Sequence, residues 1–300
     1  MLMTSGIRVS VIMNAHNSTE FLYEAIASVL VQTVHDLEVV IWDNASTDRA
    51  EAIALGFNDP RIRYFYTHEK TALYQARCDA VGQARGRYSA FLDCDDVWAP
   101  NKLERQIAVL SGPGIVASCT DYESFNEGQP DEREYFRAYT SDVVTLRDAL
   151  LPYRVGMSCL IVRTSVLHAS LPEPAPDWFF IEDLDIVSRV LLHGDLACVH
   201  EPLMRYRFHG NNASRDRSAF VRETNEWVAD LATRPMDSST ARSLAHYYRT
   251  QAVRTQVIEL LKAGRRREAL RAWTRMPMSL TKAKWAIGLI APRSLTARYS

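Results

Sequence analysis

The chain of 300 residues lacks the hallmarks of several protein classes. No apolar run approaches the roughly 18 residues that a membrane-spanning helix needs, so we expect no segment to cross a bilayer. The first residues, MLMTSGIRVSVIM, lack the basic start and long apolar stretch of a signal peptide. The 5 cysteines form no C-x-x-C pair and no zinc-like spacing. We therefore expect reduced thiols in a cytoplasmic protein.

The chain also lacks a large net charge, but its charges are unevenly distributed. Residues 1–214 carry 18 Lys and Arg against 29 Asp and Glu, a balance of −11. Residues 215–300 carry 17 against 7, a balance of +10. An acidic body is thus followed by a basic C-terminal region, and this asymmetry predicts an anionic partner for that region.

Short apolar runs alternate with helical patterns in the first hundred residues. The sequence NSTE at 17–20 resembles a capping box and predicts that a helix starts at Asn17. A second helix is expected over 73–84. Strands are expected at 8–13, 37–42, 61–66 and 88–92. This alternation predicts a doubly wound α/β sheet with parallel strands.

The second half has a less regular pattern. A helix is expected over 181–192, with Gly194 just past its end. Helices are expected again beyond residue 215. Strands are expected at 114–120 and 157–162, followed by two short strands at 196–200 and 203–208.

Acidic turns follow two of the predicted strands. Asp43 follows one strand, and Asp93, Asp95 and Asp96 follow another. In open α/β sheets, ligands bind beyond the carboxyl ends of the strands, so both turns should border one crevice. Carboxylates this close raise one another's pKa unless a positive group lies between them. The turn at Asp93 therefore predicts a metal ion, a basic side chain or solvent at its tip.

Four motifs give the chain a family resemblance. VSVIMNAHN, VVIWDNASTD, ARGRYSAFLDCDDVWAPNKLERQ and IEDLDIVSRVLLHG with YRFHGNNAS occur in the order found in family 2 glycosyltransferases. The resemblance covers roughly residues 8–214. It implies a GT-A fold, a Rossmann-like doubly wound mixed sheet, with a catalytic domain at 1–214 and a helical extension at 215–300. Many members make bacterial cell-surface polysaccharides.

The resemblance implies a donor site for a nucleotide-diphospho-sugar, with a UDP-sugar favoured. Asp43 matches an aspartate that contacts the base, and Arg77 matches an arginine near the nucleotide. Asp93 begins the D-x-D motif of the family. Ala15 and Asn17 lie in the segment that matches the end of the family's first strand.

The resemblance also implies a metal and a catalytic base. Asp95, the last residue of the D-x-D motif, matches the ligand of Mn²⁺ or Mg²⁺. His209 matches a histidine that in some GT-A enzymes helps to hold the metal or the diphosphate. Asp183 matches the likely base that activates the acceptor hydroxyl. The implied reaction is an inverting transfer to a saccharide or lipid-linked acceptor, with no nucleic-acid partner.

The chain departs from the family pattern in two places. Asn14-Ala15-His16-Asn17 stands where the family usually has Pro-Thr-Tyr-Asn. Asp43-Asn44-Ala45-Ser46 stands where the family usually has Asp-Asp-Gly-Ser. His16 offers a smaller ring than the usual tyrosine for stacking on the base. These changes leave the identity of the base open.

Other interpretations of the acidic motifs exist. The D-x-D turn is also compatible with a solvated turn before a helix at Asn101, and the acids around Asp183 with a charged helix N-terminus. Haloacid-dehalogenase-like phosphatases also place D-x-D after a strand, although there the motif normally opens the domain. A non-catalytic nucleotide-sugar-binding protein is a third possibility.

The basic region mixes Lys and Arg with apolar residues. KAGRRREALRAW and LTKAKWAIGLIAPRSL suit an interfacial helix on an anionic membrane. The protein would then lie peripherally on the inner face of the cell membrane. A helical subdomain that packs on the acidic catalytic body is the alternative, and the two interpretations are compatible.

Overall fold

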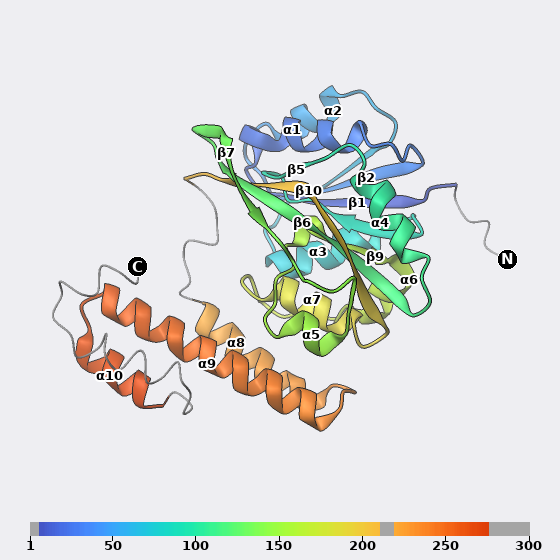
Figure 1. The fold of residues 1–300 in the computed structure, drawn as a ribbon. Coiled ribbons are helices and arrows are strands. Elements are labelled where there is room, and N and C mark those ends of the chain that lie inside the picture. The colour runs from blue at the N-terminus through green and yellow to red at the C-terminus, as the bar shows by residue number, and fades with distance from the viewer. Residues whose placement is uncertain (1–5, 211–218, 276–300) are drawn as a thin grey trace. The chain divides into compact units, whose positions relative to one another are not determined.

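The structure is a computed structural model that describes residues 6–210 and 219–275 (Figure 1). The chain divides into two compact units, Met1–Ala213 and Ser214–Ser300. The first unit holds the acidic motifs, and the second holds the basic C-terminal helices.

A mixed sheet forms the centre of the first unit. Among the described residues, its strands run in the order β3-β2-β1-β4-β9-β6-β10-β5, with β7 paired to β6 and β8 to β10. β1, β2, β3 and β4 are parallel, and β9 is antiparallel to both of its neighbours. The strands are β1 Val9–Ala15, β2 Leu37–Asn44, β3 Ile62–Thr67, β4 Tyr88–Phe91, β5 Val97–Trp98, β6 Ile115–Asn126, β7 Gln129–Phe136, β8 Val143–Val144, β9 Ile161–Arg163 and β10 Asp195–Phe208.

Helices cover both faces of this sheet. α1 and α2 lie on one face, while α3 and α7 lie on the other (Figure 1). The helices of this unit are α1 Thr19–Leu30, α2 Ala50–Gly56, α3 Leu73–Gly82, α4 Lys102–Leu110, α5 Leu146–Leu150, α6 Thr164–Ser170 and α7 Glu182–Val190, with a 3₁₀ turn, η1, at Met157–Cys159. This is the doubly wound mixed α/β architecture that the family resemblance implies.

Burial explains why the first strand and helix form. Val9, Val11 and Ile12 of β1 have no exposed surface, as expected for a strand covered on both faces. α1 buries Leu22 and Ile26 on one side, which are four residues apart and so share a helical face. The core therefore runs along the first strands and fixes where their carboxyl ends emerge.

A buried polar network fixes the C-terminal end of α3 against the sheet. Ser10 Oγ donates to Glu38 Oε1 at 2.6 Å and accepts the Gly86 N–H at 2.8 Å. A Cβ on Gly86 would lie 2.6 Å from the Ser10 nitrogen, so only glycine fits there. Arg63 pairs with Glu38 at 2.8 Å and donates to the Gln83 carbonyl. α3 is thus anchored at the amino ends of the strands and its N-terminal half covers their carboxyl ends.

The structure corrects three local predictions. The two expected strands after residue 195 are one long strand, β10, which pairs with β6 along most of its length. The expected strand at 157–162 begins as η1 and becomes extended only at Ile161. α1 starts at Thr19, not Asn17. Asn17 has a positive φ of 53°, and its side chain accepts the Thr47 N–H instead of capping α1.

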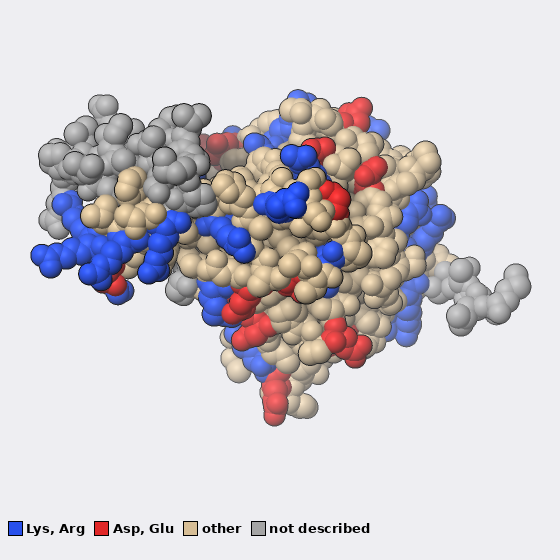
Figure 2. Space-filling model, turned by 90° about the horizontal axis from the view of Figure 1, so that it is seen from below, with Lys and Arg blue, Asp and Glu red and all other residues tan. Residues whose placement is uncertain are grey.

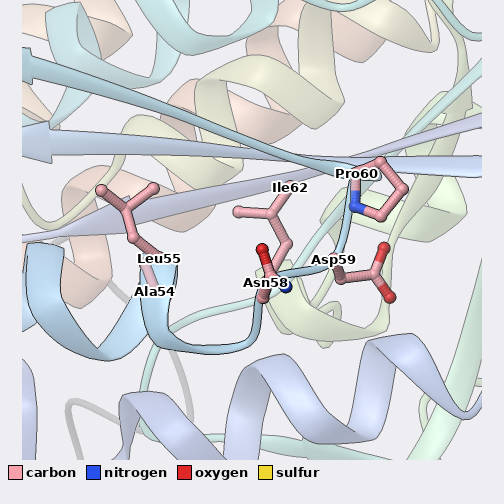
Figure 3. A pocket seen from close by; sticks show the side chains of 6 residues that line it. All are labelled: Ala54, Leu55, Asn58, Asp59, Pro60 and Ile62. Carbon is pink, nitrogen blue, oxygen red and sulfur yellow. The ribbon is translucent and has the colours of Figure 1, made fainter.

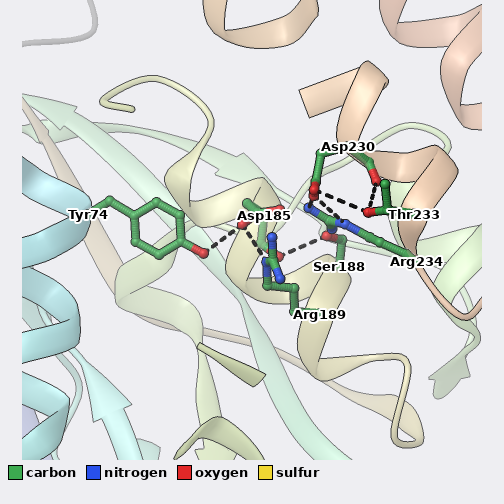
Figure 4. A network of polar contacts seen from close by, with 7 residues as sticks. All are labelled: Tyr74, Asp185, Ser188, Arg189, Asp230, Thr233 and Arg234. Carbon is green, nitrogen blue, oxygen red and sulfur yellow. Dashed lines mark hydrogen bonds and ion pairs between the residues drawn. The ribbon is translucent and has the colours of Figure 1, made fainter. Parts of the chain in front are cut away.

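The second unit contains the expected C-terminal helices, which are α8 Phe220–Asp230, α9 Ser238–Lys262 and α10 Arg266–Thr274. Asp237 caps α9 by accepting the Ser239 and Thr240 N–H groups. Arg234 pairs with Asp230 beside the start of this helix (Figure 4). α10 packs on α9 through a small apolar cluster that contains Val257, Ala269 and Ala272.

In the described part of the chain, no helix is long and apolar enough to cross a bilayer. Of the two basic segments singled out above, KAGRRREALRAW spans the end of α9 and most of α10. The other, LTKAKWAIGLIAPRSL, lies outside the described residues.

Candidate active site

Two turns meet at the carboxyl ends of β1 and β2. Asp43 is only 1% exposed, and its Oδ1 accepts the Ser46 N–H at 2.7 Å while its Oδ2 accepts the Tyr64 hydroxyl. Ser46 Oγ in turn accepts the Asn17 N–H at 2.9 Å. Asp43 therefore holds the turn that follows β2 and, through Ser46, the turn that follows Ala15. Its contact with a nucleotide base stays a prediction.

Asn44 and His16 link these turns to the segment before α3. The Asn44 amide makes two bonds with the backbone of Thr71, at 2.9 Å each. His16 Nδ1 lies 2.8 Å from the Asn44 carbonyl oxygen. These bonds tie the ends of β1 and β2 to the entry of α3, so one side of the crevice is built as a unit.

The D-x-D turn is held from across the sheet. The Asp93 N–H donates to Ser158 Oγ of η1 at 3.0 Å. Asp96 is 1% exposed and accepts the Arg207 N–H at 3.3 Å. Burial and the charges of Asp95 and Asp93 raise the pKa of Asp96 well above its ordinary value. Asp96 therefore helps to hold the turn, whereas the side chains of Asp93 and Asp95 are 38% and 30% exposed.

Asp95 meets the predicted histidine. His209 Nε2 lies 3.0 Å from Asp95 Oδ2, and the His209 ring packs against Phe21 at 4.8 Å between centroids. Arg207, on β10, donates to the Asp95 carbonyl at 3.0 Å. The long strand β10 thus brings His209 to a turn more than a hundred residues earlier in the chain.

A carboxylate and an imidazole at this distance suit a divalent cation. Within residues 6–210 and 219–275, no three acidic, His or Cys side chains are grouped as a complete metal site. Mn²⁺ and Mg²⁺ often take only one or two protein carboxylates and complete their shell with substrate phosphates and water. Asp95 and His209 therefore fit a metal that a diphosphate would help to hold.

Arg77 connects the D-x-D turn to the start of α7, which carries the expected base. It lies on α3, is 4% exposed, and pairs with Asp93 at 3.0 Å and with Glu182 at 3.5 Å. Glu182 begins α7 and is itself buried. A positive group therefore does sit beside the acidic turn, and it is a buried arginine shared by two carboxylates from different elements.

Asp183 is half-buried at the start of α7. Burial raises its pKa to about 6, although the Leu184 N–H, which donates at 2.6 Å, and the Arg77 charge act in the opposite direction. Burial, with the neighbouring charge of Asp183, raises the pKa of Glu182 to about 8. The two carboxyls therefore differ, and Asp183 is the one that is ionised more readily near neutral pH.

Asp185 is used differently from Asp183. It is fully buried, and its Oδ2 accepts the Tyr74 hydroxyl at 2.6 Å and pairs with Arg189 at 2.7 Å (Figure 4). Tyr74 belongs to α3, so this contact docks α7 on α3. Asp183 and Asp185, two positions apart on α7, therefore face different sides of this helix.

A hollow in the first unit lies away from these residues. It has a volume of about 370 Å³ and lies at the amino end of β3 (Figure 3). Its lining residues are Ala54, Leu55, Asn58, Asp59, Pro60 and Ile62. Because ligands of open α/β sheets bind at the opposite edge, we do not assign it a role.

Several contributors to the site carry no sequence signal. No motif marks the other contributors, Tyr64, Ser158 and Glu182, which lie far from the D-x-D motif in the sequence. Arg207 is one of many arginines in the chain. Contacts between distant elements identify these residues. Glu182 is the exception, because its position next to Asp183 already marks it in the sequence.

Comparison with known proteins agrees with the motifs. Residues 10–167 match the model of glycosyl transferase family 2. A Bacillus subtilis protein named for teichuronic acid biosynthesis, TuaG, is 29% identical over 220 residues, which cover 72% of this chain and 85% of TuaG. The Escherichia coli UDP-Glc:alpha-D-GlcNAc-diphosphoundecaprenol beta-1,3-glucosyltransferase WfgD is 36% identical over 118 residues, which cover 39% of this chain.

The match covers only part of the length of some of these relatives. The chain spans 47% of WfgD and 64% of a glycosyltransferase of Rickettsia typhi to which it is 26% identical.

Solved structures share the fold. Staphylococcus aureus TarS, crystallised with UDP-GlcNAc, superposes with a TM-score of 0.69 at 17% identity, covering 81% of this chain and 71% of that one. The mannosyltransferase PcManGT of Pyrobaculum calidifontis, with GDP-Man and Mn²⁺, gives a TM-score of 0.61 at 16% identity, covering 98% and 81%. The expected GT-A fold is confirmed by this likeness.

Replacing Arg77 by methionine should strongly destabilise the protein. The substitution removes the buried cation that pairs with both Asp93 and Glu182, and breaking a buried ion pair costs about 3–5 kcal/mol. Denaturant unfolding would measure the loss. Arg105→Met is the matched control, because Arg105 and its partner Glu201 are 55% and 43% exposed, and such pairs contribute about 1 kcal/mol or less. Equal losses in both variants would contradict the bridging role of Arg77.

Proposed function

The chain belongs to glycosyl transferase family 2, and on this premise we propose that it is an inverting, metal-dependent transferase. It moves a sugar from a nucleotide-diphospho-sugar to a hydroxyl of a saccharide or lipid-linked acceptor. The observation that carries the proposal is the Arg77 bridge, which joins the D-x-D aspartate Asp93 to the helix that presents Asp183. Donor and base elements are thereby held at one crevice.

The donor is proposed to lie along the carboxyl ends of the first strands. Ala15 and Asn17 would contact the nucleotide through the turn that Asp43 holds, and Asp93 with Arg77 would lie near the ribose and diphosphate. A UDP-sugar is favoured, in keeping with the UDP-GlcNAc bound to TarS, which shares the fold. Synthesis of a cell-surface polysaccharide is proposed from the names of WfgD and TuaG.

Asp95 and His209 are proposed to hold Mn²⁺ or Mg²⁺. When bound, such a cation would neutralise charge that develops on the departing diphosphate. Buried Arg77 supplies a further fixed positive charge beside Asp93. Asp96 and Ser158 keep the turn in place, so Asp95 need not reorganise to bind the cation.

Asp183 is proposed to act as the base in a single displacement. Its carboxylate takes the proton of the acceptor hydroxyl while that oxygen attacks the anomeric carbon. The bond from the anomeric carbon to the diphosphate oxygen breaks, and the nucleoside diphosphate leaves with the bonding electrons. Attack opposite to the leaving group inverts the anomeric centre.

The basic C-terminal helices are proposed to bind an anionic membrane surface near a lipid-linked acceptor, from the cytoplasmic side. Lys and Arg gather in this unit (Figure 2). On α10, Arg266, Arg267 and Arg271 are exposed around Leu270, which is itself 48% exposed. Arginines around an exposed apolar side chain are the pattern of a helix that lies in a membrane interface.

Asp95→Ala should abolish metal-dependent donor binding, because the cation loses its carboxylate ligand. Calorimetry of UDP binding with and without Mn²⁺ would measure this, and the dependence on Mn²⁺ should vanish in the variant. Asp142→Ala, at a carboxylate that is 91% exposed, is the control and should bind as the wild type does. Full Mn²⁺-dependent binding in Asp95→Ala would rule out the metal assignment.

Asp183→Asn should retain UDP binding and lose transfer by about 10²–10⁴-fold, the usual contribution of a general base. In the wild type, kcat should fall as the pH drops below about 6, because the base must be unprotonated and burial holds its pKa there. Asp177→Asn, on the segment before α7, is the control. An Asp183→Asn enzyme of normal kcat would place the base elsewhere, and wild-type binding without transfer would favour a non-catalytic binding protein.

Exchange of Arg266, Arg267 and Arg271 for Gln should reduce partition onto anionic vesicles on the order of a hundredfold, since each basic residue near the surface contributes about 1 kcal/mol. Co-sedimentation with phosphatidylserine-containing vesicles would measure it. The control exchanges three exposed arginines of the first unit, Arg105, Arg133 and Arg147, for Gln. Equal partition of both triple variants, or equal binding to neutral vesicles, would argue against this surface.

A further inference from the structure

Arg207 is a buried arginine of β10 to which the proposed reaction gives no role. Its side chain is only 8% exposed, and its guanidinium lies over two aromatic rings. The guanidinium carbon is 4.5 Å from the centre of the Phe21 ring on α1 and 4.8 Å from the centre of the Phe125 ring on β6. Because a guanidinium is planar and stacks on aromatic faces, contact with two rings fixes both its position and its orientation.

The polar bonds of Arg207 lead to the D-x-D turn. Its Nε donates to the main-chain oxygen of Asp95 at 3.0 Å, and its backbone N–H donates to Asp96 Oδ1 at 3.3 Å. Its Nη2 pairs with Glu24 of α1, a carboxylate that is 51% exposed. One residue of β10 thus binds α1 and two successive residues of the turn.

Phe21 connects Arg207 with His209. The ring that contacts the guanidinium also packs against the His209 ring, with 4.8 Å between the centroids. Phe21 and Glu24 are three residues apart on α1, a spacing that places them on one face of the helix. The first turns of α1 therefore meet the end of β10 with a ring and a carboxylate.

The pair of Asp95 and His209 needs such an anchor. The two residues are 114 positions apart in the chain, yet His209 Nε2 lies 3.0 Å from Asp95 Oδ2. Arg207 holds Asp95 directly, and it holds His209 through the two-residue link of the chain and through Phe21. Because the Nε bond goes to the main-chain oxygen, it restrains Asp95 without using the carboxylate oxygens that a cation would take.

We propose that Arg207 is a positioning residue that sets the spacing of Asp95 and His209 for a divalent cation, and that Phe21 orients the His209 ring. The inference rests on the proposed function, because it needs the metal that these two residues are proposed to hold. Groups that orient metal ligands from behind matter for affinity, and their loss typically weakens metal binding about 10–100-fold.

This role requires an arginine and not only a positive charge. A lysine ammonium is a compact point charge without a flat face. It could pair with Glu24, but it could not lie flat against the rings and donate sideways to Asp95 at the same time. Arg207→Lys should therefore fail to restore what Arg207→Met removes.

The test measures Mn²⁺ binding at saturating UDP, from the electron paramagnetic resonance signal of the free ion. Arg207→Met and Arg207→Lys should each weaken Mn²⁺ binding about 10–100-fold. At Mn²⁺ concentrations high enough to fill the site in the variants, calorimetry should give the wild-type affinity for UDP. Recovery with excess Mn²⁺ is expected of a positioning defect, because the ligands themselves are still present.

Two further variants accompany the Arg207 exchanges. Phe21→Leu keeps every charge and an apolar side chain on α1, and it should weaken Mn²⁺ binding less than Arg207→Met does, because the bond to Asp95 remains. Arg205→Met is the matched control. Arg205 lies two residues earlier on β10, with its guanidinium over the same Phe125 ring at 5.8 Å, and this variant should bind Mn²⁺ as the wild type does.

Thermal unfolding without Mn²⁺ gives a second readout. Arg207→Met should melt at a lower temperature than the wild type, because it loses buried contacts. A purely structural arginine would show this lower melting temperature together with an unchanged Mn²⁺ affinity, and that result would overturn the inference. If Arg207→Met does not fold, wild-type Mn²⁺ affinity in both Arg207→Lys and Phe21→Leu overturns it as well.

The outcomes separate this inference from the proposed function. If UDP binding by the wild type does not depend on Mn²⁺, the metal assignment fails and the role of Arg207 fails with it. If the wild type depends on Mn²⁺ and the Arg207 variants bind the ion as tightly, only the positioning role is overturned. An equal loss in Arg205→Met would also overturn it, because the effect would then not come from the contact with Asp95.

Discussion

The ion pairs of Arg77 are the contacts on which the site depends. One guanidinium, almost fully buried, serves a carboxylate after β4 and another at the start of α7. A buried charge is stable only with its partners, so α3, the D-x-D turn and α7 must come together or the buried Arg77 guanidinium loses them.

Around Arg77, the molecule divides its acidic residues by burial. Asp96 and Asp185 are sequestered and hold elements together, through Arg207 and Ser158 in one case and through Tyr74 and Arg189 in the other. Asp95 and Asp183 keep a part of their surface open. Residues of the same type, one or two positions apart, thus differ in burial and in partners according to the side of the backbone on which they lie.

The polar residues at the carboxyl ends of β1 and β2 differ in a similar way in their hydrogen bonding. Where the chain is structural, as at Asn44 and Asp43, amide and carboxylate groups are fully bonded within the protein. At Asn14 they are not.

The sequence by itself determined the α/β class, the parallel start of the sheet and the family, because strand periodicity and ordered motifs are local signals. It did not determine the start of α1: the sequence predicted Asn17 as the cap, yet the Asn17 side chain accepts the Thr47 N–H in another turn. Nor did it reveal β10 as one strand, because β10 stays continuous across its register shifts only through its pairing with β6. Only the tertiary structure decided which acids are buried, that Arg77 joins two of them, and that Asn14 is left unpaired, because burial and hydrogen bonding between distant segments are properties of packing.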